Sequence, residues 1–156
     1  MLDFECVPFE GLSLETLYTV LALRQEVFMI EQTCYYLDAD GRDQVSWHLI
    51  GRDEHGKILA YARLLPPGVP FEGHTSIGRV LTAAEARRTG AGKALLQKAI
   101  EESARIFGNF PIAISAQSYL LRFYQSFGFV EEGEEYLEDG IPHIHMTRKP
   151  HREGFF

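Results

Sequence analysis

Cysteine is scarce in this sequence, with Cys6 and Cys34 as the two examples among 156 residues. Two cysteines do not make the disulfide framework of a small secreted domain, so we expect two reduced thiols in a cytoplasmic protein. No apolar run approaches the length of a membrane-spanning helix, and we therefore expect no membrane partner. The first residues include Asp3 and Glu5 and lack a basic stretch followed by an apolar one, so we expect no signal peptide.

Positive charge is also in short supply, because 15 lysines and arginines face 22 aspartates and glutamates and leave a net charge of −7. This balance argues against nucleic acid as a partner. It is compatible with a cationic substrate such as an amine, and equally with a charge that only keeps the protein soluble. The length predicts a single domain over residues 1–149, followed by a C-terminal tail at 150–156.

The stretch at residues 75–107 predicts a strand, a glycine-bearing loop and a helix. Residues 75–82 have the β-branched and aliphatic content of a strand, and the helix opens at 87–93 and runs to about Phe107. A second apolar run follows at 111–116. A strand, a helix and a strand with so short a return form a βαβ unit, which predicts that the two strands are parallel.

The remaining segments predict alternating strands and helices around this unit. In the first helix, Leu14, Leu17, Leu21 and Phe28 are spaced as one apolar face, and residues 35–45 are polar and predict a loop. The order indicates a mixed sheet with helices on both faces. The predicted segments are a strand at 3–7, a helix from 14, an antiparallel hairpin at 47–50 and 58–65, and two final strands at 130–136 and 141–149.

The glycine-bearing loop has the features of an anion site. The first turn of a helix leaves backbone N–H groups without intrahelical partners, and the helix dipole adds partial positive charge there. Gly90 and Gly92 allow an anion to approach the backbone, and Arg87, Arg88 and Lys93 add full positive charges. The spacing is R-x-x-G-x-G, which matches neither the P-loop nor the Rossmann pattern.

This spacing resembles the acyl-CoA signature of the GNAT superfamily of N-acyltransferases, in which it binds the pyrophosphate of coenzyme A. The context agrees, because residues 119–129 follow the second strand and are similar to the helix and Gly-Phe ending of the same superfamily. The resemblance implies an α/β (α+β) GNAT fold. That fold has a mixed, mostly antiparallel sheet with a central splayed parallel strand pair and helices on both faces.

Within the superfamily, the sequence resembles the ElaA-like branch over most of residues 1–149. Tyr35 stands where that branch usually has proline, and Gln117 stands where many GNAT enzymes have an asparagine that contacts the cofactor. Gln is ordinary for this branch, and neither departure removes the cofactor site. Membership of the branch does not name a physiological substrate. The segments that carry the resemblance are 23–34, 38–43, 77–80, 115–117 and 138–144.

The resemblance implies acetyl-CoA as acyl donor and assigns a place to each of its parts. The backbone of 80–82 is expected to pair with the pantetheine amides as if they were another strand, and an N–H near Leu81 or Thr82 is expected to polarise the thioester carbonyl. The N–H groups of 88–93 are expected to hold the pyrophosphate, while the Arg87 side chain either joins them or supports the loop. The expected cofactor-binding residues are Val80, Leu81, Thr82, Arg87, Arg88, Thr89, Gly90, Ala91, Gly92, Lys93 and Gln117.

Tyr124 is the candidate general acid and matches the superfamily's acid position. Amine attack on a thioester expels a thiolate, and a phenol with a pKa of ~10 can protonate a sulfur whose conjugate acid has a pKa of ~8.5. The alternative is that Tyr124 is a packed core aromatic beside Phe123 and Phe127.

The general base has several candidates, because an alkylammonium must lose a proton before it can attack. Glu31 is the first choice, since it follows an apolar helix face where a substrate wall is expected. Asp38 and Asp40 have the alternative of a solvated loop. Arg24 is either a surface charge, a substrate contact or part of a structural ion pair. The candidates for base or substrate contact are Glu31, Arg24, Asp38, Asp40, His48 and His143.

Metal and covalent chemistry lack a complete pattern. His143 and His145 point to the same face of a strand, but no further ligand completes a metal site by spacing, and Cys34 has no assignable histidine partner. Three functions remain open. The first is an N-acetyltransferase that acts by direct attack on a small or protein amine. The others are an acyltransferase with a longer acyl donor, similar to acyl-homoserine-lactone synthases, and a non-catalytic acyl-CoA-binding sensor. A homodimer is common for the fold, but no residue requires one.

Overall fold

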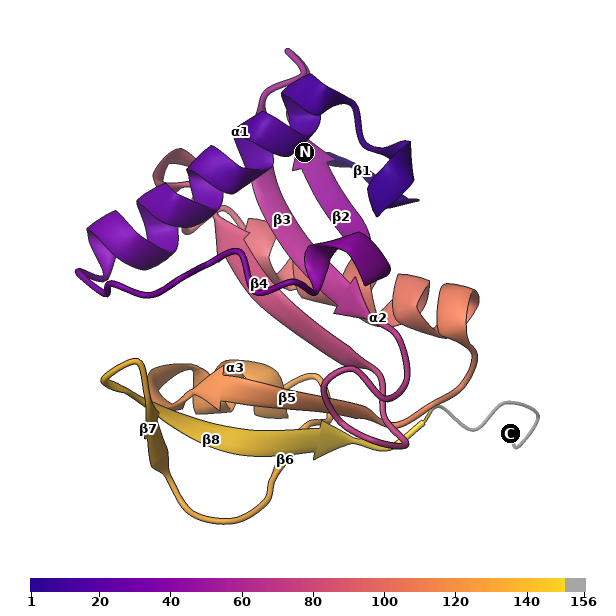
Figure 1. The fold of residues 1–156 in the computed structure, drawn as a ribbon, viewed down its shortest axis with the longest axis vertical. Coiled ribbons are helices and arrows are strands. Elements are labelled where there is room, and N and C mark those ends of the chain that lie inside the picture. The colour runs from indigo at the N-terminus through magenta and orange to yellow at the C-terminus, as the bar shows by residue number, and fades with distance from the viewer. Residues whose placement is uncertain (151–156) are drawn as a thin grey trace.

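The computed structural model describes residues 1–150, so that residues 151–156 of the expected tail lie outside the described residues. The fold is α+β, with two antiparallel sheets of four strands each (Figure 1). The first sheet has the order β1 (Asp3–Pro8), β2 (Trp47–Arg52), β3 (Ile58–Leu65) and β4 (Ser76–Thr82). In the second sheet, β8 (Ile141–Arg148) pairs with β5 (Ile112–Gln117), β6 (Val130–Glu131) and β7 (Tyr136–Glu138).

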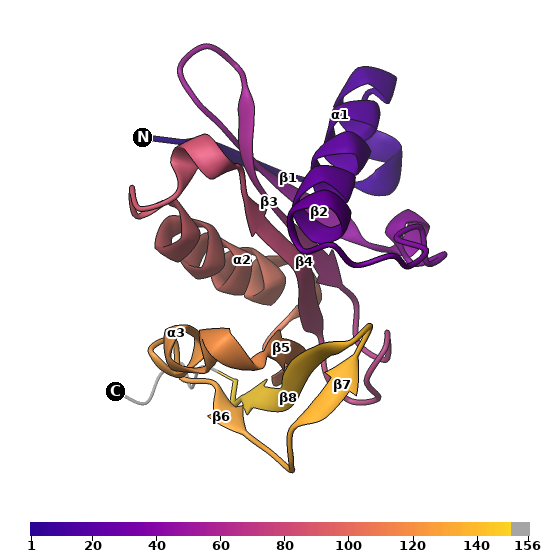
Figure 2. The same ribbon diagram turned by 90° about the vertical axis from the view of Figure 1, so that its left-hand side faces the viewer.

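Two long helical segments cover opposite faces of the first sheet, with α1 on one side and α2 on the other (Figure 2). Helix α1 (Leu14–Arg24) continues into the π-helical segment η2 (Gln25–Glu31), while α2 is Ala91–Phe107 and α3 is Leu121–Gln125. No helix within residues 1–150 is both long and apolar enough to cross a bilayer. Single turns of 3₁₀-helix lie at Phe9–Gly11 (η1), Asp43–Val45 (η3), Ala84–Ala86 (η4) and Ser118–Leu120 (η5).

The buried face of α2 is the predicted one, since Leu96, Ala99 and Ile100 all lie in the main core between the two sheets. The prediction for α1 was wrong in part, because Leu14 is 86% exposed and the fully buried residues of the helix are Val20 and Arg24. An apolar periodicity cannot show a core face that contains an arginine.

The predicted parallel pair of strands does not form a ladder in one mixed sheet. The two strands touch at a single parallel bridge between Thr75 and Ile112. There the Thr75 N–H donates to the Pro111 carbonyl at 3.0 Å, and the Ala113 N–H donates to the Thr75 carbonyl at 2.9 Å. Beyond this bridge each strand takes its ladder from an antiparallel neighbour, β3 for β4 and β8 for β5.

Candidate functional site

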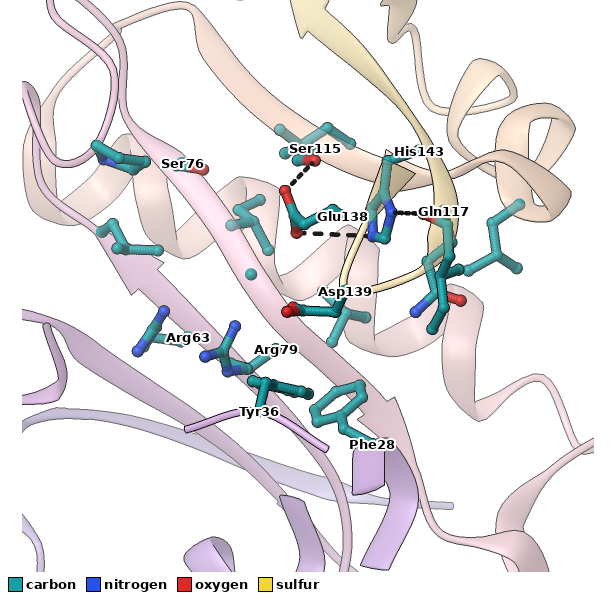
Figure 3. Close-up of a pocket in the computed structure, with 18 of the residues that line it drawn as sticks. Phe28, Tyr36, Arg63, Ser76, Arg79, Ser115, Gln117, Glu138, Asp139 and His143 are labelled. Atoms are coloured by element: carbon teal, nitrogen blue, oxygen red, sulfur yellow. Dashed lines mark hydrogen bonds and ion pairs between the residues drawn. The ribbon is translucent and has the colours of Figure 1, made fainter. Parts of the chain in front are cut away.

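Two cavities open along β4, on the side that faces the second sheet. We call the first the hairpin cavity: it has a volume of about 240 Å³ and is lined by residues 76–80 of β4, by Ser115 of β5 and by the β7–β8 hairpin (Figure 3). We call the second the helix cavity: it has a volume of about 460 Å³ and is lined by the end of β4, Gly92 of α2, and α3.

The two cavities meet at a shared wall. A molecule bound in one cavity can therefore reach a molecule bound in the other across this wall. The residues that line both cavities are Phe28, Gln32, Val80, Gln117, Leu120 and Tyr124.

A bulge in β4 lies at the junction of the cavities. Arg63 of β3 pairs with Gly78 and Tyr61 pairs with Leu81, so that Arg79 and Val80 stand opposite a single residue of β3. Arg79 has a φ of +49°, which is rare for a residue with a side chain. A bulge leaves its extra residue outside the ladder and re-aims the local backbone groups. Such groups in a strained turn of strand are suited to bind a ligand.

The first turn of α2 lies at the far end of the helix cavity. Gly90 caps the helix with a φ of +86° and no side-chain cap, and the first backbone bond inside the helix runs from the Ala94 N–H to the Gly90 carbonyl at 3.1 Å. The N–H groups that precede it, from Ala91 to Lys93, have no intrahelical acceptor. A Cβ built on Gly92 would lie 4.0 Å from the Phe123 ring, so the glycine leaves open backbone at the cavity wall. This geometry fits an anionic group such as pyrophosphate.

Arg87 supports the loop, which is the alternative that the sequence left open. Its Nη2 donates to a Glu31 carboxylate oxygen at 2.7 Å and to the Thr82 carbonyl at 3.1 Å. Glu31 itself lines the helix cavity and is absent from the wall of the hairpin cavity. The carboxylate proposed as base is thus occupied by an ion pair with Arg87.

Tyr124 is both a packed aromatic and a cavity residue, so the two sequence interpretations hold together. Its ring lies edge-on to Phe123 at 5.4 Å and to Phe129 at 5.8 Å, and the residue is 7% exposed. Burial raises the pKa of the Tyr124 phenol to about 12. Among residues 1–150 its hydroxyl has no hydrogen-bond partner, and it is therefore free to donate to a ligand.

The β7–β8 hairpin brings a polar cluster to the wall of the hairpin cavity (Figure 3). His143 lies with Nδ1 2.7 Å from the Ile141 carbonyl oxygen and Nε2 3.7 Å from a Glu138 carboxylate oxygen. Ser115 of β5 donates its hydroxyl proton to Glu138 at 3.1 Å and is also hydrogen-bonded to the Tyr136 hydroxyl. Glu138, Ser115 and Tyr136 were not among the residues chosen from the sequence.

Buried ion pairs hold the loop at 35–45 against the first sheet. Arg24 pairs with Asp38 at 2.9 Å and with Asp43 at 2.8 Å, while Arg63 pairs with Asp40 at 2.8 Å and with Asp43 at 3.0 Å. Burial alone would raise the pKa of the Asp43 carboxyl, but the hydrogen bond from Arg24 and the charges of both arginines hold it below its usual range. The same competition between burial and the Arg63 hydrogen bonds leaves the pKa of Asp40 well below its usual range.

The structure corrects several expectations for this loop. Asp38 is 7% exposed and also pairs with Arg79 at 2.8 Å, so it does not belong to a solvated loop. Arg24 is 1% exposed, so it is a structural ion-pair residue and not a surface charge. Asp40 keeps a side chain that is 22% exposed, but its carboxylate is taken up by Arg63.

His48 is also engaged inside the fold. Its Nδ1 lies 2.7 Å from the Tyr61 hydroxyl and its Nε2 lies 3.0 Å from the Asp43 carbonyl oxygen, and the residue is 1% exposed. Burial lowers the pKa of His48. Of the five residues expected to contact a substrate, His143 is thus the one that lines either of the two cavities. Within residues 1–150, no three histidine, cysteine, aspartate or glutamate side chains come close enough together to hold a metal ion.

Comparison with known proteins places this geometry in a family. A sequence model described as the acetyltransferase (GNAT) domain matches residues 28–150. A UPF0039 protein from Synechocystis is 46% identical over 138 residues, which are 88% of this chain and 89% of the relative. The solved structure of an acyl-CoA N-acyltransferase from Pseudomonas aeruginosa has a TM-score of 0.89 and 43% identity, and the match covers 95% of this chain and 99% of that one.

A second solved structure, that of Escherichia coli ElaA, has a TM-score of 0.88 and 37% identity, with 96% of this chain and all (100%) of the other covered. The likeness extends over nearly the whole of residues 1–150 and includes both sheets and the loop before α2. The chain therefore belongs to the GNAT acetyltransferase family, as a homologue of the ElaA and UPF0039 proteins.

Proposed function

We propose that this protein is an N-acetyltransferase that moves the acetyl group of acetyl-CoA to a primary amine by direct attack in a ternary complex. The observation that carries the proposal is the meeting of two cavities at Tyr124 and at the bulge of β4. One cavity ends at an anion-binding helix N-terminus, and the other ends at a hairpin with two carboxylates, Glu138 and Asp139. This arrangement suits an anionic donor on one side and a cationic acceptor on the other.

The helix cavity is the proposed donor site. The N–H groups at the start of α2 hold the pyrophosphate, with Arg88 and Lys93 as nearby charges. The pantetheine amides pair with the free edge of β4 at 80–82, in the space that opens beyond the bridge between Thr75 and Ile112. This is the role that a splayed pair of strands plays in our proposal, and Gln117 at the shared wall borders the same path.

Catalysis is assigned to groups at the junction. When bound, acetyl-CoA supplies an acetyl thioester. A backbone N–H at the end of the bulge, near Leu81, donates to the carbonyl oxygen as negative charge develops on it. The Tyr124 phenol is protonated at neutral pH because its pKa is about 12, so it acts as a donor and not as a base.

The strength of Tyr124 as an acid sets its minimum role. Its pKa of about 12 exceeds that of a thiol, ~8.5, so complete proton transfer to an isolated thiolate is uphill by roughly 5 kcal/mol. A hydrogen bond from the phenol to the developing thiolate needs no such transfer and stabilises the leaving group. The sulfur then receives its proton as the attacking nitrogen loses one.

The experiment that tests the proposal measures thiol release from acetyl-CoA by the purified protein with amino acids, polyamines, aminosugars and lysine peptides as acceptors. Calorimetry with acetyl-CoA runs beside it. We expect tight binding of acetyl-CoA and turnover on one class of amine. Turnover that requires a longer acyl donor would replace the acetyl group with that chain. Binding without turnover on any amine or donor would contradict the proposal and leave a sensor of acyl-CoA.

A further inference from the structure

The tautomer of His143 follows from its surroundings. A backbone carbonyl can only accept a hydrogen bond, and the Ile141 carbonyl oxygen lies 2.7 Å from Nδ1. The proton of the neutral ring is therefore on Nδ1. The lone pair is then on Nε2, which lies on a side chain at the wall of the hairpin cavity. A neutral imidazole with a free Nε2 in a cavity is equipped to accept a proton.

The group nearest to Nε2 is suited to hold the charged ring after it has taken a proton. A Glu138 carboxylate oxygen lies 3.7 Å from Nε2. The other oxygen of Glu138 accepts a hydrogen bond from Ser115 at 3.1 Å, and the Tyr136 ring stacks on the His143 ring at 6.2 Å. The imidazolium would thus donate from Nδ1 to a carbonyl and face a carboxylate with Nε2, which is the arrangement that favours a positive charge.

The charges around the ring agree with this role. On its own hairpin the ring faces Glu138, with Asp139 next in the turn and also at the cavity wall. Across the cavity lie Arg63 and Arg79, whose charges are paired with Asp40 and Asp38 (Figure 3). The hairpin side of the cavity is therefore the acidic side, and it is the side that attracts an ammonium group.

We propose that His143 is the general base for the amine acceptor, and that Glu138 is the residue that positions it, a proposal that rests on the function proposed above. The ammonium group of the acceptor gives one proton to Nε2, which passes it to solvent. The neutral nitrogen forms a bond to the acetyl carbon as the carbon–sulfur bond breaks. The second proton of that nitrogen ends on sulfur, with Tyr124 as the donor, so the products are an amide, a thiol and one proton.

The acceptor class follows from the same geometry. The substrate that needs this base is a primary amine that is protonated at neutral pH, such as an alkylamine or a lysine side chain, with a pKa of ~10.4. It enters through the hairpin cavity, between β4 and the acidic hairpin. An amine that is already neutral has no need of the histidine.

The test compares His143→Gln, Glu138→Gln and Glu31→Gln with the parent protein, using the best acceptor found and a pH range from 7 to about 10. At pH 7 we expect kcat/KM to fall about 100-fold or more in His143→Gln, and by a smaller factor in Glu138→Gln. The loss should shrink as the pH approaches the pKa of the amine, because the acceptor then arrives deprotonated. Unchanged melting temperature and unchanged affinity for acetyl-CoA establish that the variants are folded.

Two results overturn the assignment of His143. One is a rate for His143→Gln that equals the parent, or a loss that is the same at every pH. The other is the pH-dependent loss in Glu31→Gln, which would make Glu31 the base although it is paired with Arg87. A parent protein that releases no thiol with any amine is a different outcome, because it contradicts acetyl transfer itself and removes the basis of the proposal.

Discussion

At the scale of single residues, Tyr124 shows that a core position and a catalytic position can be the same. Its ring packs among aromatic neighbours, and its hydroxyl has no partner among residues 1–150. A residue that served only packing would lose little when the hydroxyl is removed, because phenylalanine has the same ring. A residue that donates to a leaving group would lose activity without losing stability.

Tyr124→Phe is therefore expected to lower kcat by at least about tenfold while leaving the melting temperature and the affinity for acetyl-CoA unchanged. Steady-state kinetics and calorimetry check the two parts. Tyr18→Phe is the matched control, because Tyr18 is 78% exposed on α1 and lines neither cavity. Equal kinetics for the Tyr124 and Tyr18 variants would remove Tyr124 from the mechanism.

Arg24 illustrates the opposite case, a charged residue whose role is structural. Arg24→Met leaves Asp38 and Asp43 buried without one of their cations, and we expect a loss of about 3 to 5 kcal/mol in the free energy of unfolding. Arg52→Met breaks the exposed pair with Glu5 and should cost less than about 1 kcal/mol. Urea denaturation measures both, and similar losses in the two variants would contradict the account of the buried network.

The same network predicts how stability depends on pH. The pKa of Asp40 and that of Asp43 are lower in the folded protein than in an unfolded chain. Such a carboxylate stabilises the fold above its unfolded pKa, ~3.9, and this contribution is lost as the pH falls below that value. We expect the free energy of unfolding to drop steeply below about pH 4, and less steeply in Arg24→Met, where Asp43 loses a cation. Parallel pH curves for parent and variant would contradict this.

At the scale of elements, the first turn of α2 separates a binding role from a folding role. An aspartate near a helix N-terminus stabilises the helix but repels an anionic ligand. Gly92→Asp places the charge at the wall of the helix cavity, and Ala94→Asp places it on the exposed side of the same turn. We expect both variants to keep their melting temperature, and only Gly92→Asp to raise the Kd for acetyl-CoA, by about tenfold or more. Calorimetry with an equal loss in both variants would contradict the proposed pyrophosphate site.

The elements that could be predicted from the sequence are those fixed by local signals. The glycine loop and the apolar period of α2 placed its last residue, Phe107, and its buried face correctly. The hairpin of β2 and β3 was also predicted in place. The Asp139-Gly140 turn carried a signal that was not used: a two-residue turn fixes the register and sets Tyr136 opposite His143. That register would have pointed to the polar cluster at His143.

At the scale of the whole molecule, the contacts that escaped prediction join segments that are distant in sequence. Arg24 and Asp43 lie 19 residues apart, and no periodicity within α1 indicates that an arginine completes its core face. The division into two sheets depends on which neighbour each strand finds, and the single bridge between Thr75 and Ile112 cannot be derived from either strand alone. The candidate site lies at this division, so its cavities became visible with the structure, whereas its loop and its tyrosine were visible before.

The central claim is that donor and acceptor occupy the two cavities at the same time and that the acetyl group passes directly between them. Initial velocities with acetyl-CoA and the amine varied together test it most directly. Direct transfer predicts lines that intersect in double-reciprocal plots, because both substrates must be bound before the thiol leaves. Parallel lines would indicate an acetylated protein as an intermediate and would contradict this account.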